Sequence, residues 1–420
     1  MSLGRALGAR LGAGAVVLVG RDTRRSGPMI EGALAAGLAS AGVSVRSGGV
    51  LPTPAIAELV AFDAQLAAGA VISASHNPFP DNGIKLFGSD GFKLPDVEES
   101  AIEASLGAPG DRPTGEALGA IDGWQDARTE YLDRLLTRLP HRLDGVDVAI
   151  DCANGATVST AHAALTQLGA RVTVVADQPD GVNINVACGS THLDLISHTV
   201  VAGGHDLGLA FDGDGDRVLA VSGDGAVVDG DQILAVLALD LHAQAALPHH
   251  TVVTTTMTNL GFRRAMRDAG IEVRWTDVGD RYVLAEMRAG GFVLGGEQSG
   301  HVINLGHGPT GDGLAVGIQL LGALSRTGET LAEAASVMTR LPQRLVNIRV
   351  ERKNDLATAT AVWDAVAVCE HELGENGRVV VRPSGTEPLV RVMVEAPTEA
   401  DCDRWCAELT SVTKAALGAE

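Results

Sequence analysis

The feature that most constrains the fold of this 420-residue chain is a regular alternation of short apolar runs with stretches of helical periodicity. Apolar runs such as Val16–Val19 and Leu207–Phe211 have the length of buried strands, and Ala-rich stretches such as Met29–Ala41 have the length of helices. This alternation is typical of α/β units. Because open α/β sheets bind ligands at the carboxyl ends of their strands, the loops after the strands are the expected place of the chemistry.

The alternation resolves into four modules, each with one distinctive loop after a strand. A chain of this length predicts about three domains, at roughly 150 residues each, so the pattern adds one module to that expectation. We place the modules at residues 1–142, 143–240, 241–343 and 344–420. Within them we predict strands at 16–19, 70–73, 171–175 and 207–211, helices at 29–41, 125–139 and 159–168, and a loop at 106–119.

The net charge of the chain disfavours some functional classes of protein. With 32 basic and 52 acidic residues, the chain carries a formal net charge of −20. Nucleic-acid-binding proteins present a basic surface, so this balance disfavours that class. It stays compatible with a phosphorylated small substrate, because local clusters of charge set the field inside a cleft. No apolar run approaches the roughly 20 residues that a membrane-spanning helix needs.

The cysteines and the first residues of the chain indicate in which cellular compartment the protein is expected. The five cysteines are odd in number and form no C-x-x-C pair, which indicates reduced thiols rather than a disulfide scaffold. A short helix-like stretch follows Met1, and the first strand leads into the polar loop Arg21–Arg25 rather than into a signal-peptide cleavage site. We therefore expect a cytoplasmic protein.

The acidic loop Asp212–Asp216 (DGDGD) carries the strongest chemical signal. Three carboxylates at alternate positions, separated by glycines, can converge on one hard cation. An EF-hand is excluded, because Arg217 stands where that loop needs glycine and Gly223 where it needs glutamate. An aspartyl-phosphate phosphatase loop would need threonine at Asp216, which weakens that interpretation, and a solvated acidic turn is the remaining alternative. The loop predicts a divalent-metal site.

Ser75 follows a predicted strand in the loop Ala74–Pro78 (ASHNP), with Lys85 close behind. Taken alone, this serine is more typical of a turn or a helix cap, and the G-x-S-x-G pattern of hydrolases is absent. Beside a three-aspartate loop, it indicates a phosphoserine whose phosphoryl oxygen completes the shell of a magnesium ion. Lys85 could then neutralise charge or move a proton at the reacting oxygen.

Two further loops suit a phosphorylated sugar. Arg382–Pro388 (RPSGTEP) combines a guanidinium, two hydroxyls and glycine-freed backbone N–H groups, which are the donors that a phosphate dianion needs. Gly295–His301 (GGEQSGH) places Glu297, Ser299 and His301 at alternate positions, where they could bind vicinal hydroxyls. Each loop alone is equally typical of an ordinary polar turn. Neither has the spacing of a dinucleotide-binding fingerprint.

Together these four loops, in this order and spacing, resemble those of the α-D-phosphohexomutase superfamily, over residues 14 to 412 or so. The resemblance implies a four-domain fold, with three similar mixed α/β sheet domains and a C-terminal α+β domain around a central cleft. Further stretches resemble the branch of the superfamily that acts on glucosamine phosphates, namely Asp151–Gly155, Gly181–Asn185, Val228–Gln232 and Val278–Val283.

The resemblance implies an isomerase that interconverts glucosamine 6-phosphate and glucosamine 1-phosphate and so supplies amino-sugar nucleotide for cell-wall synthesis. The reaction would pass through phosphorylated Ser75 and a glucosamine 1,6-bisphosphate intermediate. The phosphomannomutase/phosphoglucomutase branch of the superfamily is the alternative. From the residues themselves, a metal-dependent phosphatase and an inactive sugar-phosphate-binding protein also stay open. The expected partners are small sugar phosphates, and a homodimer is left open.

The resemblance also implies roles for individual residues. Asp212, Asp214 and Asp216, with the Ser75 phosphate, would hold one Mg²⁺ per subunit, while Arg217 orients the phosphoserine and Lys85 and His76 serve proton transfer or electrostatics. The expected substrate-binding residues are Gly279, Asp280, Arg281, Glu297, Ser299, His301, Arg382, Ser384, Gly385, Thr386 and Arg391.

One departure from the family pattern concerns the first module. Members of the superfamily normally open with a strand and a loop reading like F-G-T-D-G-I-R-G, and this sequence has neither. Two explanations stay open: a start assigned too far downstream, or a true truncation. We expect a missing N-terminal strand to leave an unpaired sheet edge and exposed apolar surface, with poor folding or little activity as the result.

Overall fold

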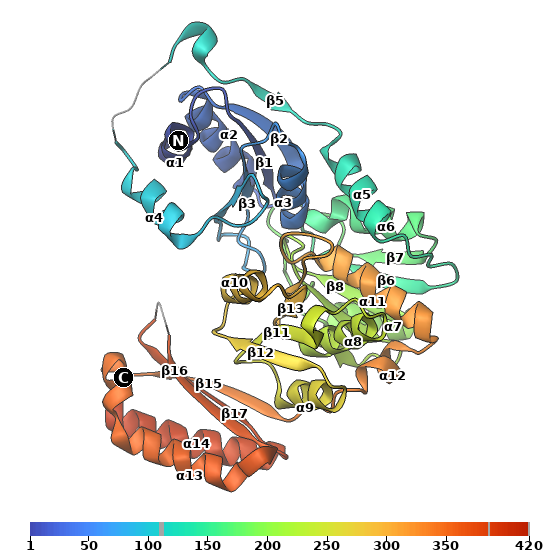
Figure 1. The fold of residues 1–420 in the computed structure, drawn as a ribbon, viewed down its shortest axis with the longest axis vertical. Helices are drawn as coiled ribbons and strands as arrows, with labels where there is room; N and C mark the ends of the chain where they lie inside the picture. The colour runs from blue at the N-terminus through green and yellow to red at the C-terminus, as the bar shows by residue number, and fades with distance from the viewer. Residues whose placement is uncertain (109–112, 385–386, 419–420) are drawn as a thin grey trace. The chain divides into compact units, whose positions relative to one another are not determined.

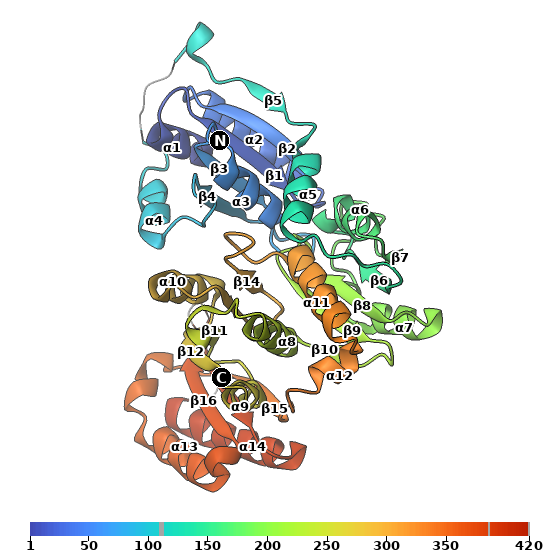
Figure 2. The same cartoon turned by 45° about the vertical axis from the view of Figure 1, so that its right-hand side comes forward.

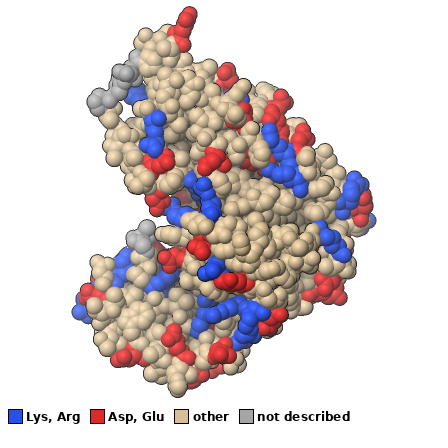
Figure 3. All heavy atoms as spheres, in the orientation of Figure 1, with Lys and Arg blue, Asp and Glu red and all other residues tan. Residues whose placement is uncertain are grey.

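The computed structural model describes residues 1–108, 113–384 and 387–418 (Figure 1). The chain forms two compact units: Met1–Thr255 with Arg274–Ser336, and Thr256–Val273 with Val337–Glu420. No helix in the described part of the chain is long and apolar enough to cross a membrane. Figure 3 shows acidic and basic side chains interspersed on the visible face, so the net charge of −20 is not gathered there in one acidic patch.

The first sheet is built around the apolar strand β1. Its strands are β1 (Val16–Arg21), β2 (Ser44–Val50), β3 (Ala68–Ile72), β4 (Ile84–Gly88) and β5 (Ile121–Gly123), in the order β4-β3-β1-β2-β5. Only β4 runs antiparallel to its neighbour. The helices of this module are α1 (Ser2–Leu11), α2 (Gly27–Ala39), α3 (Thr53–Phe62), α4 (Asp96–Ala104) and α5 (Ala127–Arg138).

Both faces of the sheet are covered at its central strands, which explains why β1 and β3 are apolar and mostly buried. Val17 and Val19 pack with Leu38 of α2 on one face, where residues of α1 join the same core. The opposite face carries glycine at Gly20, against Ile56 of α3, because a Cβ there would lie 2.5 Å from the isoleucine side chain. Figure 2 shows α3 beside β3 and the whole module from a second side.

The second sheet repeats this plan and ends in the acidic loop. Its strands are β6 (Asp147–Asp151), β7 (Arg171–Val175), β8 (Leu207–Phe211), β9 (Val218–Ser222) and β10 (Val227–Val228), in the order β10-β9-β8-β6-β7. The associated helices are α6 (Ala161–Gln167) and α7 (Asp194–Gly203). Since β8 and β9 pair antiparallel, the loop between them is a tight hairpin at the end of a fully buried strand.

The third sheet is shorter. Its strands are β11 (Thr251–Thr255), β12 (Glu272–Thr276), β13 (Leu294–Gly296) and β14 (Val302–Asn304), in the order β12-β11-β13-β14. Its helices are α8 (Gly230–Ala243), α10 (Asp280–Gly290), α11 (Gly313–Thr327) and α12 (Leu331–Ala335). The predicted sugar-binding loop joins β13 to β14, again as an antiparallel hairpin.

The second unit contains the C-terminal module. Strands β15 (Gln343–Arg349), β16 (Arg378–Pro383) and β17 (Leu389–Glu395) form an antiparallel sheet in the order β15-β17-β16. The helices of this unit are α9 (Leu260–Asp268), α13 (Thr360–Leu373) and α14 (Glu399–Leu417). Trp405 and Leu409 of α14 pack with Val392 of β17 in one apolar core. The short 3₁₀ helices of the whole chain are Gly115–Ala117, Ala156–Ser159, Pro248–His250, Lys353–Thr358 and Gly374–Asn376.

The predicted fold class is confirmed: three mixed α/β sheet modules precede an α+β module. The strands predicted at 171–175 and 207–211 are correct to the residue, and the helix-like stretch after Met1 is α1. The helix predicted from Ser159 is wrong at its start, because a 3₁₀ turn precedes α6 there. The loop predicted at 106–119 contains a 3₁₀ turn at Gly115–Ala117. The first three sheets fall inside the first three predicted ranges, and the fourth sheet begins at Gln343, one residue before its predicted range. The boundaries of the modules remain predictions.

Candidate active site

Ser75 lies in the turn that follows β3. It is 9% exposed, and its φ of 50° is a left-handed conformation that costs a non-glycine residue about 1–3 kcal/mol. Its Oγ donates a hydrogen bond to Oδ2 of Asp212 at 2.5 Å. The ends of β3 and β8, which belong to two different sheets, therefore meet at this serine.

The acidic loop offers a ready set of metal ligands. Asp212, Asp214 and Asp216 each present a carboxylate oxygen within 4.8 Å of the others, and all three residues are buried. Oδ1 of Asp214 and Oδ1 of Asp216 have no hydrogen-bond partner among the described residues. Leaving a buried carboxylate oxygen without a partner is costly, and hard oxygen ligands suit Mg²⁺. The donor set thus fits a divalent cation.

Glycines allow the acidic loop to approach the Ser75 turn. A Cβ at Gly213 would lie 2.5 Å from the carbonyl oxygen of Ser75, closer than real Cβ contacts come. Gly215 has a φ of 73°, the left-handed region that glycine adopts without strain. The alternation of aspartate and glycine is therefore needed for the shape of the loop as well as for its charge.

The pKa values of two carboxylates of the acidic loop, Asp212 and Asp216, are shifted in opposite directions. Burial raises the pKa of Asp212 well above its ordinary value, and the nearby Asp216 and Asp214 raise it further. Burial also acts to raise the pKa of Asp216, but the cations Lys85 and Arg217 and the ring of His301 outweigh it and lower that pKa. The site thus holds Asp216 more firmly in its ionised form than Asp212.

Lys85, which extends from β4, is the cation closest to the acidic loop among the described contacts. Its Nζ lies 2.6 Å from Oδ2 of Asp214 and 3.0 Å from Oδ2 of Asp216. Burial would lower the pKa of this ammonium, but the two carboxylates raise it, so Lys85 stays charged. The structure therefore brings the predicted lysine to the predicted metal loop.

His76 and Arg217 complete the cluster around the serine. Nδ1 of His76 lies 3.4 Å from Oγ of Ser75, and burial, followed by the charge of Arg217, lowers the pKa of this imidazole. The backbone N–H of Arg217 donates to Oδ1 of Asp212 at 3.2 Å. All the predicted catalytic and metal-binding residues thus lie together, and their individual roles remain predictions.

The predicted sugar-binding loop reaches the same place. Nδ1 of His301 lies 3.6 Å from Oδ1 of Asp216, and its Nε2 lies 3.9 Å from Oδ2 of Asp280. Oε1 of Glu297 accepts a hydrogen bond from the backbone N–H of Gly279 at 3.1 Å. Ser299 Oγ is buried and has no hydrogen-bond partner among the described residues. The histidine of this loop therefore lies beside the acidic loop.

Arg281 and Asp280 make ion pairs that the sequence does not reveal. Arg281 pairs with Asp96 of α4, so its guanidinium is engaged with a carboxylate rather than held apart for a substrate. Asp280 pairs with Lys93, which lowers the pKa of this carboxyl to about 2 against the effect of burial. The predicted substrate-binding roles of Asp280 and Arg281 remain predictions.

The predicted phosphate-binding loop belongs to the second unit. Arg382 of β16 stands directly opposite Arg391 of β17, and Nη2 of Arg391 lies 3.4 Å from Oε2 of Glu387. Ser384 is 3% exposed, and Nζ of Lys353 donates to its carbonyl oxygen at 2.8 Å. Gly385 and Thr386 lie outside the described residues.

Sequence reasoning missed several residues that hold the site together. Thr53, at the start of α3, donates from Oγ1 to Oδ2 of Asp214. Asn185 donates from Nδ2 to the carbonyl oxygen of Ser75 at 2.9 Å, and Arg24 donates to the same oxygen. Arg24 lies in the polar stretch Arg21–Arg25, and Asn185 ends the stretch Gly181–Asn185 that carries part of the family resemblance, so each position has a local signal in the sequence.

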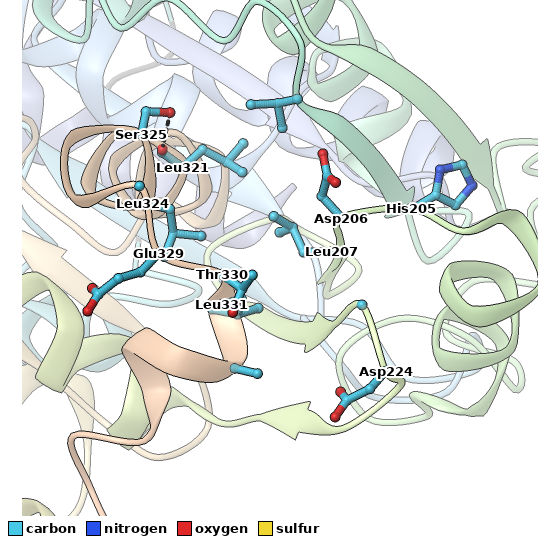
Figure 4. Close-up of a pocket in the computed structure, with 14 residues that line it drawn as sticks. His205, Asp206, Leu207, Asp224, Leu321, Leu324, Ser325, Glu329, Thr330 and Leu331 are labelled. Carbon is cyan, nitrogen blue, oxygen red and sulfur yellow. Dashed lines mark hydrogen bonds between the residues drawn. The ribbon is translucent and has the colours of Figure 1, made fainter.

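A separate hollow of about 580 Å³ lies away from these residues (Figure 4). Its floor is apolar and its described lining includes carboxylates but no lysine or arginine. The labelled side chains in Figure 4 include Leu207, Leu321, Leu324, Leu331, Asp206, Asp224 and Glu329. A phosphate needs cationic or N–H donors, so this hollow does not suit a sugar phosphate.

The fold and the site define a phosphohexomutase. The chain matches all four domain models described as phosphoglucomutase/phosphomannomutase: domain I at residues 1–111, domain II at 129–225, domain III at 229–341 and the C-terminal domain at 345–412. The chain belongs to this family and is an isomerase.

Relatives of known name place it more narrowly within the family. A phosphoglucosamine mutase of Saccharopolyspora erythraea is 54% identical over 401 residues, covering 95% of this chain and 90% of that protein. A phosphoglucosamine mutase of Thermobifida fusca is 53% identical over 383 residues, covering 91% of this chain and 85% of that protein.

A solved structure agrees with the fold. A phosphoglucomutase/phosphomannomutase family protein from Burkholderia thailandensis superimposes with a TM-score of 0.84 at 25% identity, covering 100% of this chain and 94% of that one. The N-acetylphosphoglucosamine mutase of Aspergillus fumigatus has a TM-score of 0.67 at 18% identity, covers 86% of this chain and 92% of that one, and shows the fold alone.

Proposed function

We propose that the protein interconverts glucosamine 6-phosphate and glucosamine 1-phosphate through a phosphorylated Ser75 and a glucosamine 1,6-bisphosphate intermediate. The observation that carries this proposal is the 2.5 Å hydrogen bond between Oγ of Ser75 and Asp212 of a buried three-carboxylate loop. The names of relatives at 54% and 53% identity support glucosamine phosphate as the substrate. The five cysteines, all free and buried, suit a reducing compartment, and we assign the reaction to the cytoplasm.

In the first half-reaction, the Oγ–P bond of phosphorylated Ser75 breaks as a hydroxyl oxygen of the bound sugar phosphate forms a new bond to phosphorus. The hydroxyl proton passes to a basic group of the site. Asp212, with Oδ2 2.5 Å from Oγ, and His76, with Nδ1 3.4 Å from Oγ, both lie close to the oxygen that leaves. In the second half-reaction the sugar bisphosphate has turned round and returns its other phosphoryl group to Ser75.

Asp212, Asp214 and Asp216, with the Ser75 phosphate, would hold Mg²⁺, which supplies positive charge next to the oxygens that become negative during transfer. Lys85 adds a second fixed cation, because its ammonium is already held 2.6 Å from Asp214. Arg217 orients the phosphoserine from the far end of the acidic loop.

The remaining residues hold the substrate in either orientation. The sugar hydroxyls are bound by Glu297, Ser299 and His301, whose carboxylate, hydroxyl and imidazole groups lie on one hairpin and can accept or donate hydrogen bonds. Ser299 Oγ is buried and has no protein partner among the described residues. Arg382 and Arg391 bind the phosphate that is not reacting, because they are a cross-strand pair of guanidinium groups beside the predicted phosphate-binding loop, and guanidinium groups bind phosphate bidentately.

The test combines mass spectrometry with kinetics. Intact-mass analysis of the purified protein should find one phosphate on Ser75, and Ser75→Ala should abolish both the phosphate and mutase turnover. Ser89→Ala, at an exposed serine of the neighbouring turn, is the matched control and should keep both. Turnover of glucosamine 1-phosphate should exceed that of glucose 1-phosphate and mannose 1-phosphate.

Each alternative has its own outcome in this test. Faster turnover of either neutral sugar would assign the protein to the phosphomannomutase/phosphoglucomutase branch instead. Release of inorganic phosphate that is lost in Asp212→Asn but survives in Ser75→Ala would indicate a metal-dependent phosphatase. Binding of sugar phosphates without phosphate on Ser75 and without turnover would indicate an inactive binding protein.

A further inference from the structure

Arg24 is a fully buried arginine directly beneath the Ser75 turn. It belongs to the polar stretch Arg21–Arg25, which starts at the last residue of β1 and precedes α2, and which the proposed reaction does not use. Buried arginines are rare unless their charge is paired and their donors are satisfied. The charge is paired with Asp22, because Nε of Arg24 lies 2.8 Å from Oδ2 of that equally buried carboxylate.

All five N–H donors of the Arg24 guanidinium are used. Nε donates to Asp22, while Nη2 donates to the carbonyl oxygens of Ser75 at 2.9 Å and Asn77 at 2.8 Å. Nη1 donates to the carbonyl oxygen of Asp81 at 3.0 Å and to that of Pro78. One rigid fork thus binds four carbonyl groups of the turn that carries the serine.

The amide on the other side of Ser75 is tied to the same ion pair. The backbone N–H of Ser75 donates to Oγ of Ser73 at 2.9 Å. That hydroxyl in turn donates to Oδ2 of Asp22 at 2.6 Å. Both the N–H and the carbonyl group of Ser75 are therefore anchored to Asp22 and Arg24.

This double anchor explains the strained backbone of Ser75. A residue with a side chain keeps a φ of 50° only where its surroundings over-determine that conformation. Here the anchor turns the carbonyl of Ser75 toward Arg24 and leaves Oγ facing Asp212 at 2.5 Å. The strain is thus part of the arrangement that presents the hydroxyl to the acidic loop.

We propose that Arg24 is a positioning residue for phosphoryl transfer, acting through the backbone of Ser75 rather than by touching the substrate. The inference rests on the proposed function, in which Oγ of Ser75 gives up a phosphoryl group and takes one back in every turnover. A displaced Oγ slows both half-reactions, and a displacement of about 1 Å can lower the rate about 100-fold.

Lysine cannot replace arginine here. Its ammonium keeps the charge but has three donors on a single atom, so it cannot reach Asp22 and four carbonyl oxygens at once. Arg24→Lys should therefore preserve the buried ion pair with Asp22 while it releases part of the turn. Arg46→Lys is the matched control, because the fork of Arg46 binds Asp63 and Gln65 at a distant loop of the same sheet.

The expected kinetic result is a split between kcat and KM. In Arg24→Lys, kcat should fall about 10- to 100-fold with KM for the sugar phosphate unchanged within about twofold, because the substrate contacts are intact. Arg46→Lys should change neither constant. A wild-type kcat in Arg24→Lys, or an equal fall in Arg46→Lys, would overturn the proposal.

Hydrogen–deuterium exchange separates this inference from the proposed function, because it needs no sugar. Amides of residues 73–82 should exchange at least about tenfold faster in Arg24→Lys than in the wild type, with the rest of the first sheet unchanged. Unchanged exchange in this segment would overturn the proposal, even if the wild type turned over glucosamine phosphates. If the wild type lacked turnover, the proposed function would fail while the exchange comparison still stood.

A second variant covers the case in which Arg24→Lys does not fold. Ser73→Ala removes only the hydroxyl that links Asp22 to the Ser75 amide and leaves the guanidinium in place. It should lower kcat by a smaller factor than Arg24→Lys, again without a change in KM, and should speed exchange at Ser75. Unchanged kcat and exchange in Ser73→Ala would count against the anchor.

Discussion

Glu58 offers a quantitative test of the electrostatics, because it is a carboxyl group buried between two helices. It lies on α3, is 2% exposed, and pairs through Oε2 with Arg138 of α5. Oε1 is buried without a hydrogen-bond partner among the described residues. Burial raises the pKa of Glu58 from 4.5 to about 7, with Asp312 adding to the rise and Arg138 opposing it.

The sign of the effect follows from which state holds the proton. Between about pH 4.5 and 7 the folded protein keeps a proton on Glu58 that the unfolded chain has released, so folding stability falls as the pH rises through this window. The full shift corresponds to about 3 kcal/mol at 1.36 kcal/mol per pKa unit. Between about pH 5 and 8, this titration lowers the free energy of unfolding by about 2.5 kcal/mol.

Glu58→Gln removes this titration and keeps the size of the side chain. We expect the free energy of unfolding of the wild type, minus that of the variant, to fall by about 2.5 kcal/mol from about pH 5 to 8, as measured by urea unfolding. Because both proteins contain every other titrating group, those contributions cancel. A difference that stays constant within about 0.5 kcal/mol would refute the reasoning.

Infrared spectroscopy measures the same pKa without unfolding the protein. The band of the protonated carboxyl that is lost in Glu58→Gln should titrate in the wild type near pH 7. Arg138→Met tests the assigned cause, since loss of the opposing cation should move the midpoint higher. A midpoint near 4.5 in the wild type would show that burial does not govern this group.

Two further predictions concern the acidic loop. Lys85→Met removes the ammonium that competes with Mg²⁺ for Asp214 and Asp216. Mg²⁺ should therefore raise the melting temperature more in this variant than in the wild type or in Lys414→Met, a control at an exposed lysine. Equal rises in all three proteins would refute the competition. Gly213→Ala would place a Cβ 2.5 Å from the carbonyl oxygen of Ser75 and should lower kcat about 100-fold. Gly32→Ala is the control, because its Cβ would meet no atom within 4 Å, and it should leave kcat unchanged. Similar kinetics in both variants would show that the close contact between Gly213 and the Ser75 carbonyl group is not needed.

The sequence predicts the fold well where burial leaves a clear pattern. The strand Leu207–Phe211 is apolar because it is covered on both faces, and its bounds are correct. The edge strand β5 is missed, because its three residues Ile121–Gly123 are all exposed and show no alternation. It joins the sheet through backbone pairing with β2, which no side-chain pattern records.

The same limit applies to the candidate site. The spacing of the aspartates places three carboxylates in one turn, because that geometry is local. The pairs Lys93–Asp280 and Arg281–Asp96 join residues more than 180 positions apart. They form because the packing of the modules brings α10 close to α4 and the residues just before it. No local sequence pattern at any of these four residues predicts its partner.

The carbonyl oxygen of Ser75 shows what motif analysis leaves out. It accepts hydrogen bonds from Arg24 of the first module and Asn185 of the second, and the backbone at Gly213 comes close to it. None of these contacts involves the side chain that marks the serine motif. Because the position of Oγ depends on the position of this carbonyl group, residues of the second module act on the reacting serine through its backbone. A substitution at Asn185, 110 positions from Ser75, therefore belongs with substitutions of the serine loop in any interpretation of kinetics.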